Sequence, residues 1–213
     1  MTSPLTALVR AAAKAPVVPV LVVDSVEQAA PLAKALLDGG LTIAEVTLRT
    51  PAGVGVIEAM KRAAPELLVG AGTVLNGSDV RNSLDAGADF LVSPGMSPGL
   101  LDALADNRGL MIPGVATASE AMSRYEEGFE LLKLFPANIA GGIPALKALG
   151  APLPHLKFMP TGGVSAENAG DYLALPNVFA VGGSWIATKD DVSAGSWNAI
   201  AAKAREALRA VGR

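Results

Sequence analysis

Short apolar runs alternate with longer segments of helical composition along the whole chain of 213 residues. Eight such runs, rich in Val, Ile and Leu, cover residues 17–23, 43–48, 67–73, 90–93, 110–115, 131–135, 156–161 and 178–182. Their spacing of roughly twenty-odd residues is typical of βα units, in which a helix follows each strand and packs on the sheet. The alternation therefore predicts an α/β protein with a parallel sheet.

Eight βα units predict a (β/α)8 TIM barrel at the short end of its size range. Segments 26–38 and 78–86 are predicted helices that end at glycines, and the stretch 1–14 predicts a short amphipathic N-terminal helix. A doubly wound open sheet is the alternative, but a glycine-rich loop should then follow its first strand. The turn Val23-Asp24-Ser25-Val26 has no glycine. No shift in composition divides the chain, so we expect one barrel domain over residues 1–213.

Charge and the scarcity of Cys and His exclude several classes of function. With 17 Lys and Arg against 20 Asp and Glu, the formal net charge is -3, and no basic stripe for nucleic acid is present. The absence of cysteine and the single histidine, His155, exclude disulfides, thiolate nucleophiles and a histidine-rich metal site. The apolar stretch after residue 14 is short and interrupted by prolines, unlike a signal peptide or membrane span. We expect a cytoplasmic protein with no nucleic-acid or membrane partner.

Lys133 lies inside the apolar run Leu131-Leu132-Lys133-Leu134-Phe135, where an ammonium group is out of place. Side chains alternate along a strand, so both faces of this strand are mostly apolar, as in a parallel sheet covered by helices. Burial disfavours the charged amine and leaves a free amine that can attack a ketone. The alternative is that Lys133 ends an edge strand and extends its methylene chain to solvent.

The second predicted strand carries polar side chains on one face. Alternation places Glu45, Thr47 and Arg49 together, with apolar residues on the other face. In a barrel the polar face must point inward, where ionised groups need partners or a chemical role. Glu45 and Arg49 could simply pair with each other, which would be a structural role.

These three ionisable groups suit chemistry on a 2-keto acid. Lys133 supplies an amine that condenses with a ketone, and the resulting iminium draws electrons from a neighbouring C–C bond. Glu45 is suited to move protons at that centre, and Arg49 offers a planar fork for a carboxylate. The iminium does the work of a metal ion, so no metal or organic cofactor is expected.

Glycines follow several of the predicted strands. The third strand ends in Gly70-Ala71-Gly72-Thr73, where small residues allow close approach and Thr73 adds a hydroxyl, although tight packing explains the glycines equally well. Paired glycines follow the seventh and eighth strands, in Thr161-Gly162-Gly163 and Gly182-Gly183-Ser184. Barrels commonly bind phosphate at these two strand ends, through exposed backbone N–H groups. Plain turns are the alternative.

Taken in order, these motifs resemble those of the 2-keto-3-deoxy-6-phosphogluconate (KDPG) and 4-hydroxy-2-oxoglutarate (KHG) aldolases, which work through a lysine Schiff base. The motifs that carry the resemblance, from about residue 16 to residue 185, are residues 45–50, 70–74, 93–95, 133–137, 160–163 and 182–185. Each motif is short, but their order is specific. The resemblance implies cleavage of a phosphorylated 2-keto acid without a cofactor, a place in the Entner–Doudoroff pathway of carbohydrate metabolism, and assembly into a homotrimer.

Roles carry over by position. The resemblance implies that Lys133 forms the imine and Glu45 moves protons. The implied substrate contacts are Arg49 and Thr73 at the pyruvate carboxylate, Pro94 and Phe135 around the pocket, and Thr161, Gly162, Gly163, Gly183 and Ser184 at the hydroxyl and phosphate end. The residues after Glu45 favour the gluconate over the galactonate substrate. Asn138 replaces a common glutamate and Met159 a common cysteine.

Two other functions fit a barrel with a phosphate site. A phosphosugar isomerase or epimerase would use Glu45 as base and would need no buried lysine. A sugar-phosphate binding protein without activity would need only the glycines. Covalent capture of pyruvate on Lys133 separates the aldolase from the first, and release of pyruvate separates it from the second.

Overall fold

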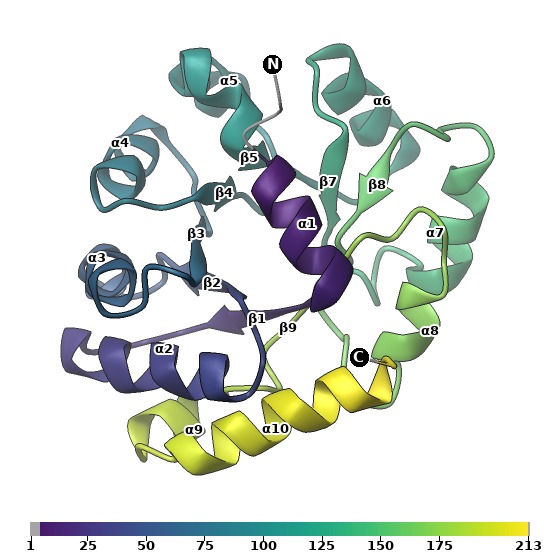
Figure 1. Ribbon diagram of the computed structural model, residues 1–213. Coiled ribbons are helices and arrows are strands. Elements are labelled where there is room, and N and C mark those ends of the chain that lie inside the picture. The colour runs from purple at the N-terminus through teal and green to yellow at the C-terminus, as the bar shows by residue number, and fades with distance from the viewer. Residues whose placement is uncertain (1–4, 213) are drawn as a thin grey trace.

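A ring of helices surrounds a parallel barrel in the computed structural model, which describes residues 5–212 (Figure 1). The strands are β1 (Val17–Leu21), β2 (Ile43–Thr47), β3 (Leu68–Gly72), β4 (Phe90–Val92), β5 (Met111–Ile112), β6 (Gly114–Val115), β7 (Leu131–Leu134), β8 (Lys157–Phe158) and β9 (Val181–Gly183). The α-helices are α1 (Thr6–Lys14), α2 (Ala29–Asp38), α3 (Gly53–Ala63), α4 (Gly77–Asp85), α5 (Pro98–Leu104), α6 (Ala118–Glu126), α7 (Gly142–Gly150), α8 (Ala169–Leu173), α9 (Lys189–Ser193) and α10 (Trp197–Ala210). Two 3₁₀ helices are η1 (Val26–Gln28) and η2 (Ala105–Leu110).

Two parallel sheets close into one barrel. The first has the order β5-β4-β3-β2-β1-β9, and the second has the order β6-β7-β8. Pro113 joins β5 to β6, and its carbonyl accepts a hydrogen bond from the N–H of Lys133 at 2.9 Å. On the other side of the second sheet, two isolated bridges close the barrel. Phe158 of β8 pairs with Val178, before β9, and Thr161, after β8, pairs with Gly182 of β9. The predicted (β/α)8 barrel is confirmed, and so is the short N-terminal helix over Thr6–Lys14. Residues 1–4 of the stretch predicted to form it lie outside the described residues.

The strands differ most from the prediction at three places, and elsewhere their ends differ by one or two residues. The fifth run, expected over 110–115, is split at Pro113 because proline has no N–H to donate to a sheet ladder. The seventh strand is reduced to Lys157–Phe158. The eighth begins three residues later than predicted, at Val181, and Val178 contributes only an isolated bridge. These irregular strands lie together on one side of the barrel, between β6 and β9.

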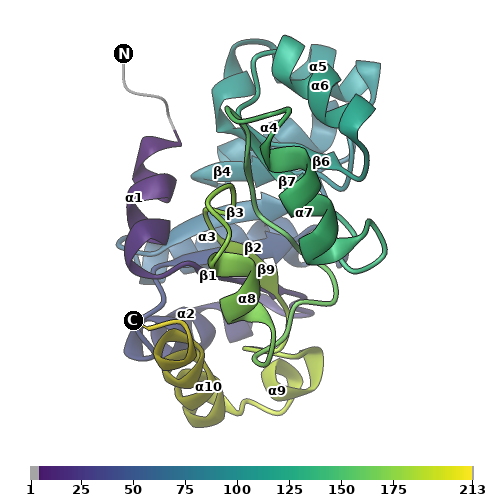
Figure 2. The same cartoon turned by 90° about the vertical axis from the view of Figure 1, so that its right-hand side faces the viewer.

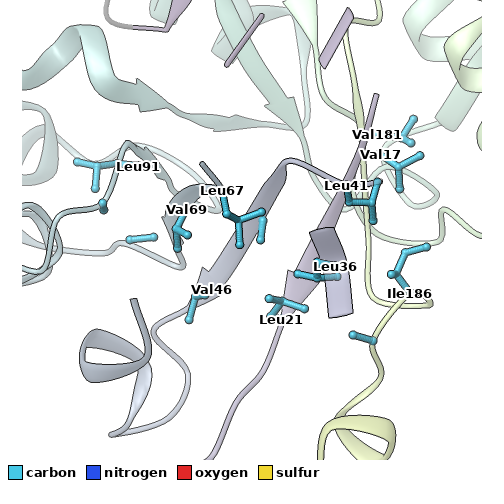
Figure 3. Close-up of a cluster of buried hydrophobic side chains, with 14 of the residues drawn as sticks. Val17, Leu21, Leu36, Leu41, Val46, Leu67, Val69, Leu91, Val181 and Ile186 are labelled. Carbon is cyan, nitrogen blue, oxygen red and sulfur yellow. The ribbon is translucent and has the colours of Figure 1, made fainter. Parts of the chain in front are cut away.

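Strand side chains divide into an outer and an inner layer. Val17 and Leu21 of β1 and Val46 of β2 point outward into a buried apolar cluster that also contains Leu36 of α2 (Figure 3). Val18, between two of these outward positions, belongs to a separate inner cluster. This is the alternation expected of strands in a barrel covered by helices.

Helix α1 closes one end of the barrel. Leu8 and Ala12 of α1 are buried in the inner cluster with Val18, Ile43 and Phe90, which lie at or near the starts of their strands. Figure 1 shows α1 lying across the barrel, and Figure 2 shows it at one edge of the molecule. The amino-terminal end of the barrel is therefore filled with apolar side chains. None of the helices between residues 5 and 212 has the length and apolar run needed to cross a membrane.

Replacing Leu8 should test this closure. Leu8 is 3% exposed, so Leu8→Ala removes buried methyl groups and should lower the free energy of unfolding by about 3 kcal/mol. The matched change Val9→Ala, at a side chain that is 39% exposed on the same helix, should cost less than about 0.5 kcal/mol. Urea denaturation measures both. Equal losses for the two variants would contradict the packing of α1 described above.

Candidate active site

A lysine and a glutamate form an ion pair inside the barrel. Lys133 of β7 donates from Nζ to both carboxylate oxygens of Glu45 of β2, at 3.0 Å to Oε1 and 3.3 Å to Oε2. The lysine is 4% exposed and the glutamate 0%. Because the strands lie 88 residues apart in the chain, only closure of the barrel brings the two groups together.

Strand alternation accounts for the burial of Lys133. Its neighbours Leu132 and Leu134 point outward into the layer under the helices, which leaves Lys133 on the inner face. Its strand is not an edge, because β7 pairs with β6 on one side and β8 on the other. The alternative in which Lys133 reaches solvent is therefore wrong.

Gly72 provides the space that the carboxylate of Glu45 occupies. A Cβ at Gly72 would lie 2.2 Å from Oε1 of Glu45, closer than any side chain could approach. Gly70 has a different role, since a Cβ there would meet the ring of Phe90 at 2.2 Å. Thus one glycine of Gly70-Ala71-Gly72 serves apolar packing, and the other admits the carboxylate to the barrel interior.

Arg49 and Thr73 meet at the carboxyl ends of β2 and β3. Nε of Arg49 donates to Oγ1 of Thr73 at 3.2 Å. The alternative pairing of Arg49 with Glu45 is wrong, because Glu45 pairs with Lys133. Thr73 has a φ of +62°, which is strained for a β-branched residue. Such strain persists where surrounding structure imposes it, often at binding sites.

A small cavity of about 140 Å³ opens beside these residues. Its walls are Val20, Val22, Arg49, Phe135, Thr161, Gly162, Gly163, Val164, Gly183 and Ser184. The structure thus brings seven of the predicted site residues to one cavity at the carboxyl ends of the strands. The three valines were missed, although Val20 and Val22 lie on the inward face of the first strand, where alternation would have found them.

Four predicted residues lie outside the cavity wall. Glu45 and Lys133 form the buried pair, and Nζ of Lys133 lies 5.3 Å from the ring centroid of Phe135, a wall residue. Thr73 reaches the wall through its hydrogen bond to Arg49. The Pro94 carbonyl instead packs against Gly114 of β6, where a Cβ would lie 2.2 Å from its oxygen.

The paired glycines after β8 leave backbone N–H groups free. Gly162 and Gly163 have φ values of +96° and +76°, a conformation that favours glycine. In the described part of the chain, the N–H groups of Gly163 and Val164 donate to no other protein group, whereas that of Gly162 is turned toward Gly182 across the bridge Thr161↔Gly182. Successive unpaired N–H groups beside a cavity form a binding site for an anion.

Other hollows of the molecule lie away from this chemistry. One of about 460 Å³ lies beside α10, near Trp185 and Lys203, and another of about 390 Å³ lies near Lys147 and Lys157. Neither is lined by any of the predicted site residues. Among residues 5–212, no group of three or more His, Cys, Asp or Glu side chains could hold a metal ion.

Known proteins share this arrangement of sequence and fold. The sequence profile of the family described as KDPG and KHG aldolase matches residues 9–203. The chain belongs to the KDPG and KHG aldolase family. Aldolases make and break carbon–carbon bonds, so the chain is a carbon–carbon lyase.

Individual members of the family are similar over almost their whole length. A 2-dehydro-3-deoxy-phosphogluconate aldolase of Pseudoalteromonas atlantica is 48% identical, over 91% of this chain and 90% of the relative. The KHG/KDPG aldolase of Escherichia coli is 46% identical, over 91% of each chain. A crystal structure of the Legionella pneumophila KDPG aldolase, with pyruvate captured as a covalent carbinolamine, has a TM-score of 0.89 and 42% identity, over 96% of this chain and 97% of that chain.

The buried pair of this aldolase should behave as one unit in a double-mutant cycle. Lys133→Met alone leaves the Glu45 carboxylate buried without a cation and should lower the free energy of unfolding by about 3–5 kcal/mol. Adding Glu45→Leu removes that carboxylate and should restore most of the loss, as urea denaturation can measure.

An exposed pair provides the control. Lys34 and Asp38 of α2 are paired at 2.9 Å, with side chains 75% and 52% exposed. The corresponding cycle, Lys34→Met with Asp38→Leu, should show almost no coupling, because solvent screens the two charges. Purely additive losses at Lys133 and Glu45 would contradict a buried, coupled pair.

Proposed function

We propose that this aldolase cleaves 2-keto-3-deoxy-6-phosphogluconate to pyruvate and glyceraldehyde 3-phosphate through an imine on Lys133. The observation that carries the proposal is the buried Lys133–Glu45 pair beside a cavity with free backbone N–H groups. Similarity to curated KDPG aldolases and to a structure with a captured carbinolamine supports the same reaction. We propose that 4-hydroxy-2-oxoglutarate is a second substrate, as the name of the Escherichia coli relative suggests.

Imine formation requires a neutral amine and a proton acceptor close to it. The Glu45 carboxylate, 3.0 Å from Nζ of Lys133, is placed to accept a proton from that nitrogen. The amine then attacks the keto carbon and forms a carbinolamine, and loss of water gives the protonated imine. Both steps take place in a site nearly closed to solvent, where a charged intermediate depends on the neighbouring carboxylate.

Cleavage follows from the electron demand of the iminium. Glu45, directly or through a water molecule, removes the proton of the C4 hydroxyl, and the C3–C4 bonding electrons move to the iminium to give an enamine. Glyceraldehyde 3-phosphate leaves. Protonation of the enamine at C3 and hydrolysis of the imine release pyruvate and return the free lysine.

The two anionic ends of the substrate have separate partners. We assign the carboxylate of the pyruvate half to the guanidinium of Arg49 and the hydroxyl of Thr73, which are already joined at 3.2 Å. We assign the space around it to Phe135, a wall residue, and to Pro94, which lies outside the cavity wall. We assign the hydroxyl and phosphate end to Thr161, Gly162, Gly163, Gly183 and Ser184, which line one cavity.

Several expectations from the sequence stay predictions. They are the extent of the single domain over residues 1–213, the cytoplasmic location, the homotrimer and the preference for the gluconate substrate. The homotrimer and the preference come from the family resemblance. The other two come from composition and patterning.

Borohydride added with pyruvate should trap a covalent adduct on Lys133. Reduction of the imine fixes the three carbons of pyruvate to Nζ, and peptide mass spectrometry locates them. Lys133→Met should lose the adduct and the release of pyruvate from the phosphorylated substrate, measured with coupled lactate dehydrogenase. The control Lys147→Ala, at an exposed lysine of α7, should keep both.

Each rival function predicts another outcome. An unmodified Lys133 alongside intact turnover would favour a phosphosugar isomerase or epimerase. A wild-type protein that binds sugar phosphate but releases no pyruvate would favour a binding protein without activity.

Glu45→Gln should separate proton transfer from substrate binding. The amide keeps the shape of the carboxylate but cannot accept a proton, so kcat for cleavage should fall by about 100-fold to 10,000-fold while KM changes little. Steady-state kinetics on the phosphorylated substrate measures both. Glu58→Gln, at an exposed carboxylate of α3, is the control and should match wild type. A kcat within threefold of wild type would remove Glu45 from the proposed mechanism.

A further inference from the structure

We infer that Asn168 is a positioning residue that holds the backbone of Gly162 and Gly163 in the orientation needed to bind the phosphate end of the substrate. This inference rests on the proposed function, because it concerns the end of the cavity assigned to phosphate. Asn168 itself does not line that cavity. It acts through hydrogen bonds to the backbone of the loop that lines the cavity.

Asn168 makes two hydrogen bonds to the loop that follows β8. Its Nδ2 donates to the carbonyl of Gly163 at 3.0 Å, and its Oδ1 accepts from the N–H of Ser165 at 2.9 Å. The side chain therefore bridges the loop across Val164. One amide group fixes both the carbonyl before Val164 and the N–H after it.

Helix capping explains only one of these contacts. The carbonyl of Ser165 accepts from the N–H of Ala169, so the bond from the Ser165 N–H to Oδ1 of Asn168 is the return contact of a capping box. Asn168 occupies the N-cap position of α8, where an asparagine side chain usually accepts a hydrogen bond from the first turn of the helix. It makes no such bond. Its Nδ2 is turned back toward the glycine loop, so the bond to the carbonyl of Gly163 is the contact that capping leaves unexplained.

Asn168 completes a series of three fixed carbonyls. The carbonyl of Thr161 accepts from the N–H of Ala137 at 2.8 Å, and that of Gly162 accepts from the N–H of Asn138 at 3.1 Å. The third carbonyl, that of Gly163, is held by Asn168. The first two partners come from the backbone of the loop after β7, and only the third is a side chain.

Fixing the carbonyls determines where the N–H groups point. The C=O and N–H of one peptide unit point in opposite directions because the unit is planar and trans. Carbonyls held on Thr161, Gly162 and Gly163 therefore orient the N–H groups of Gly162, Gly163 and Val164 to the opposite side. Of these, the N–H groups of Gly163 and Val164 have no protein acceptor, and both residues line the cavity.

The loop needs this support because its residues are conformationally free. Gly162 and Gly163 are in the left-handed region, which glycine enters and leaves at little cost. On one side the loop is limited by Asn138, whose Cβ and Cγ would each lie 2.5 Å from a Cβ at Gly163. On the other side, Asn168 supplies the hydrogen bond that selects one orientation of the Gly163–Val164 peptide. Without this hydrogen bond, the peptide can rotate, and its N–H then no longer points into the anion site.

The experiment compares the phosphate end with the pyruvate end of the same site. Two variants remove the donor to Gly163: Asn168→Ala and Asn168→Asp, the second of which keeps the shape and the acceptor. In both, KM for 2-keto-3-deoxy-6-phosphogluconate should rise roughly tenfold, the effect of losing one well-placed hydrogen bond of about 1.4 kcal/mol. The rate of borohydride trapping with pyruvate, which has no phosphate, should stay at the wild-type value. Asn82→Ala, at an exposed asparagine of α4, is the control and should change neither quantity.

Each outcome decides the inference. An unchanged KM in both variants overturns it. A KM raised only in Asn168→Asp also overturns it, because the new negative charge alone would then account for the effect. A trapping rate that falls by the same factor as kcat/KM shows general damage to the barrel and assigns Asn168 a structural role only. Failure of the wild-type protein to trap pyruvate is a different result, since it rejects the proposed function and not the role of Asn168.

Discussion

The pairing of two opposite charges inside a closed barrel is the constraint on which the site depends. A lone ammonium or carboxylate in that interior would be strongly destabilising, whereas a hydrogen-bonded pair is tolerated. The pair in turn requires the inward registers of β2 and β7 and an empty position at Gly72, which a Cβ would fill. Lys133 and Glu45 therefore make the barrel specific, because a register shift of one residue in either strand would separate them.

The two ends of the barrel carry different tasks. At the amino-terminal end, the interior is filled by apolar side chains, including Leu8 and Ala12 of α1. Burial of these side chains stabilises the fold. At the carboxyl end, the chain accepts a strained φ at Thr73 and left-handed conformations at Gly162 and Gly163. A well-packed base permits such strain above it, because the surrounding structure holds these residues in place. Stability and chemistry are thus separated along the barrel axis, as is usual in this fold.

The sequence revealed local features and left distant partnerships open. Periodicity was sufficient to find the strands, and alternation placed Glu45 on the inward face of its strand, because both depend only on neighbouring residues. Alternation left the position of Lys133 open, because both faces of its strand are mostly apolar. The partner of Glu45 was not predictable in this way: Arg49, four residues away, was a reasonable candidate, and the true partner is 88 residues away. The hydrogen bonds of Asn168 were missed for a related reason. An asparagine before a helix signals a cap, and nothing local indicates that its amide turns back toward a loop.

The size of the cavity places a further demand on the site. About 140 Å³ is less than the lower limit of about 300 Å³ typical of ligand pockets, so the whole substrate would extend beyond this cavity unless a wall moved. The glycine wall is held by backbone and side-chain hydrogen bonds and is poorly suited to moving. Arg49 is exposed and bound to Thr73 by a single hydrogen bond of 3.2 Å. The carboxyl end of β2 is held independently of Arg49. The hydroxyls of Thr47 and Thr50 donate hydrogen bonds to backbone carbonyls of β1 and of the residues that follow it. A rotation of the Arg49 guanidinium would therefore leave the position of Glu45 unchanged.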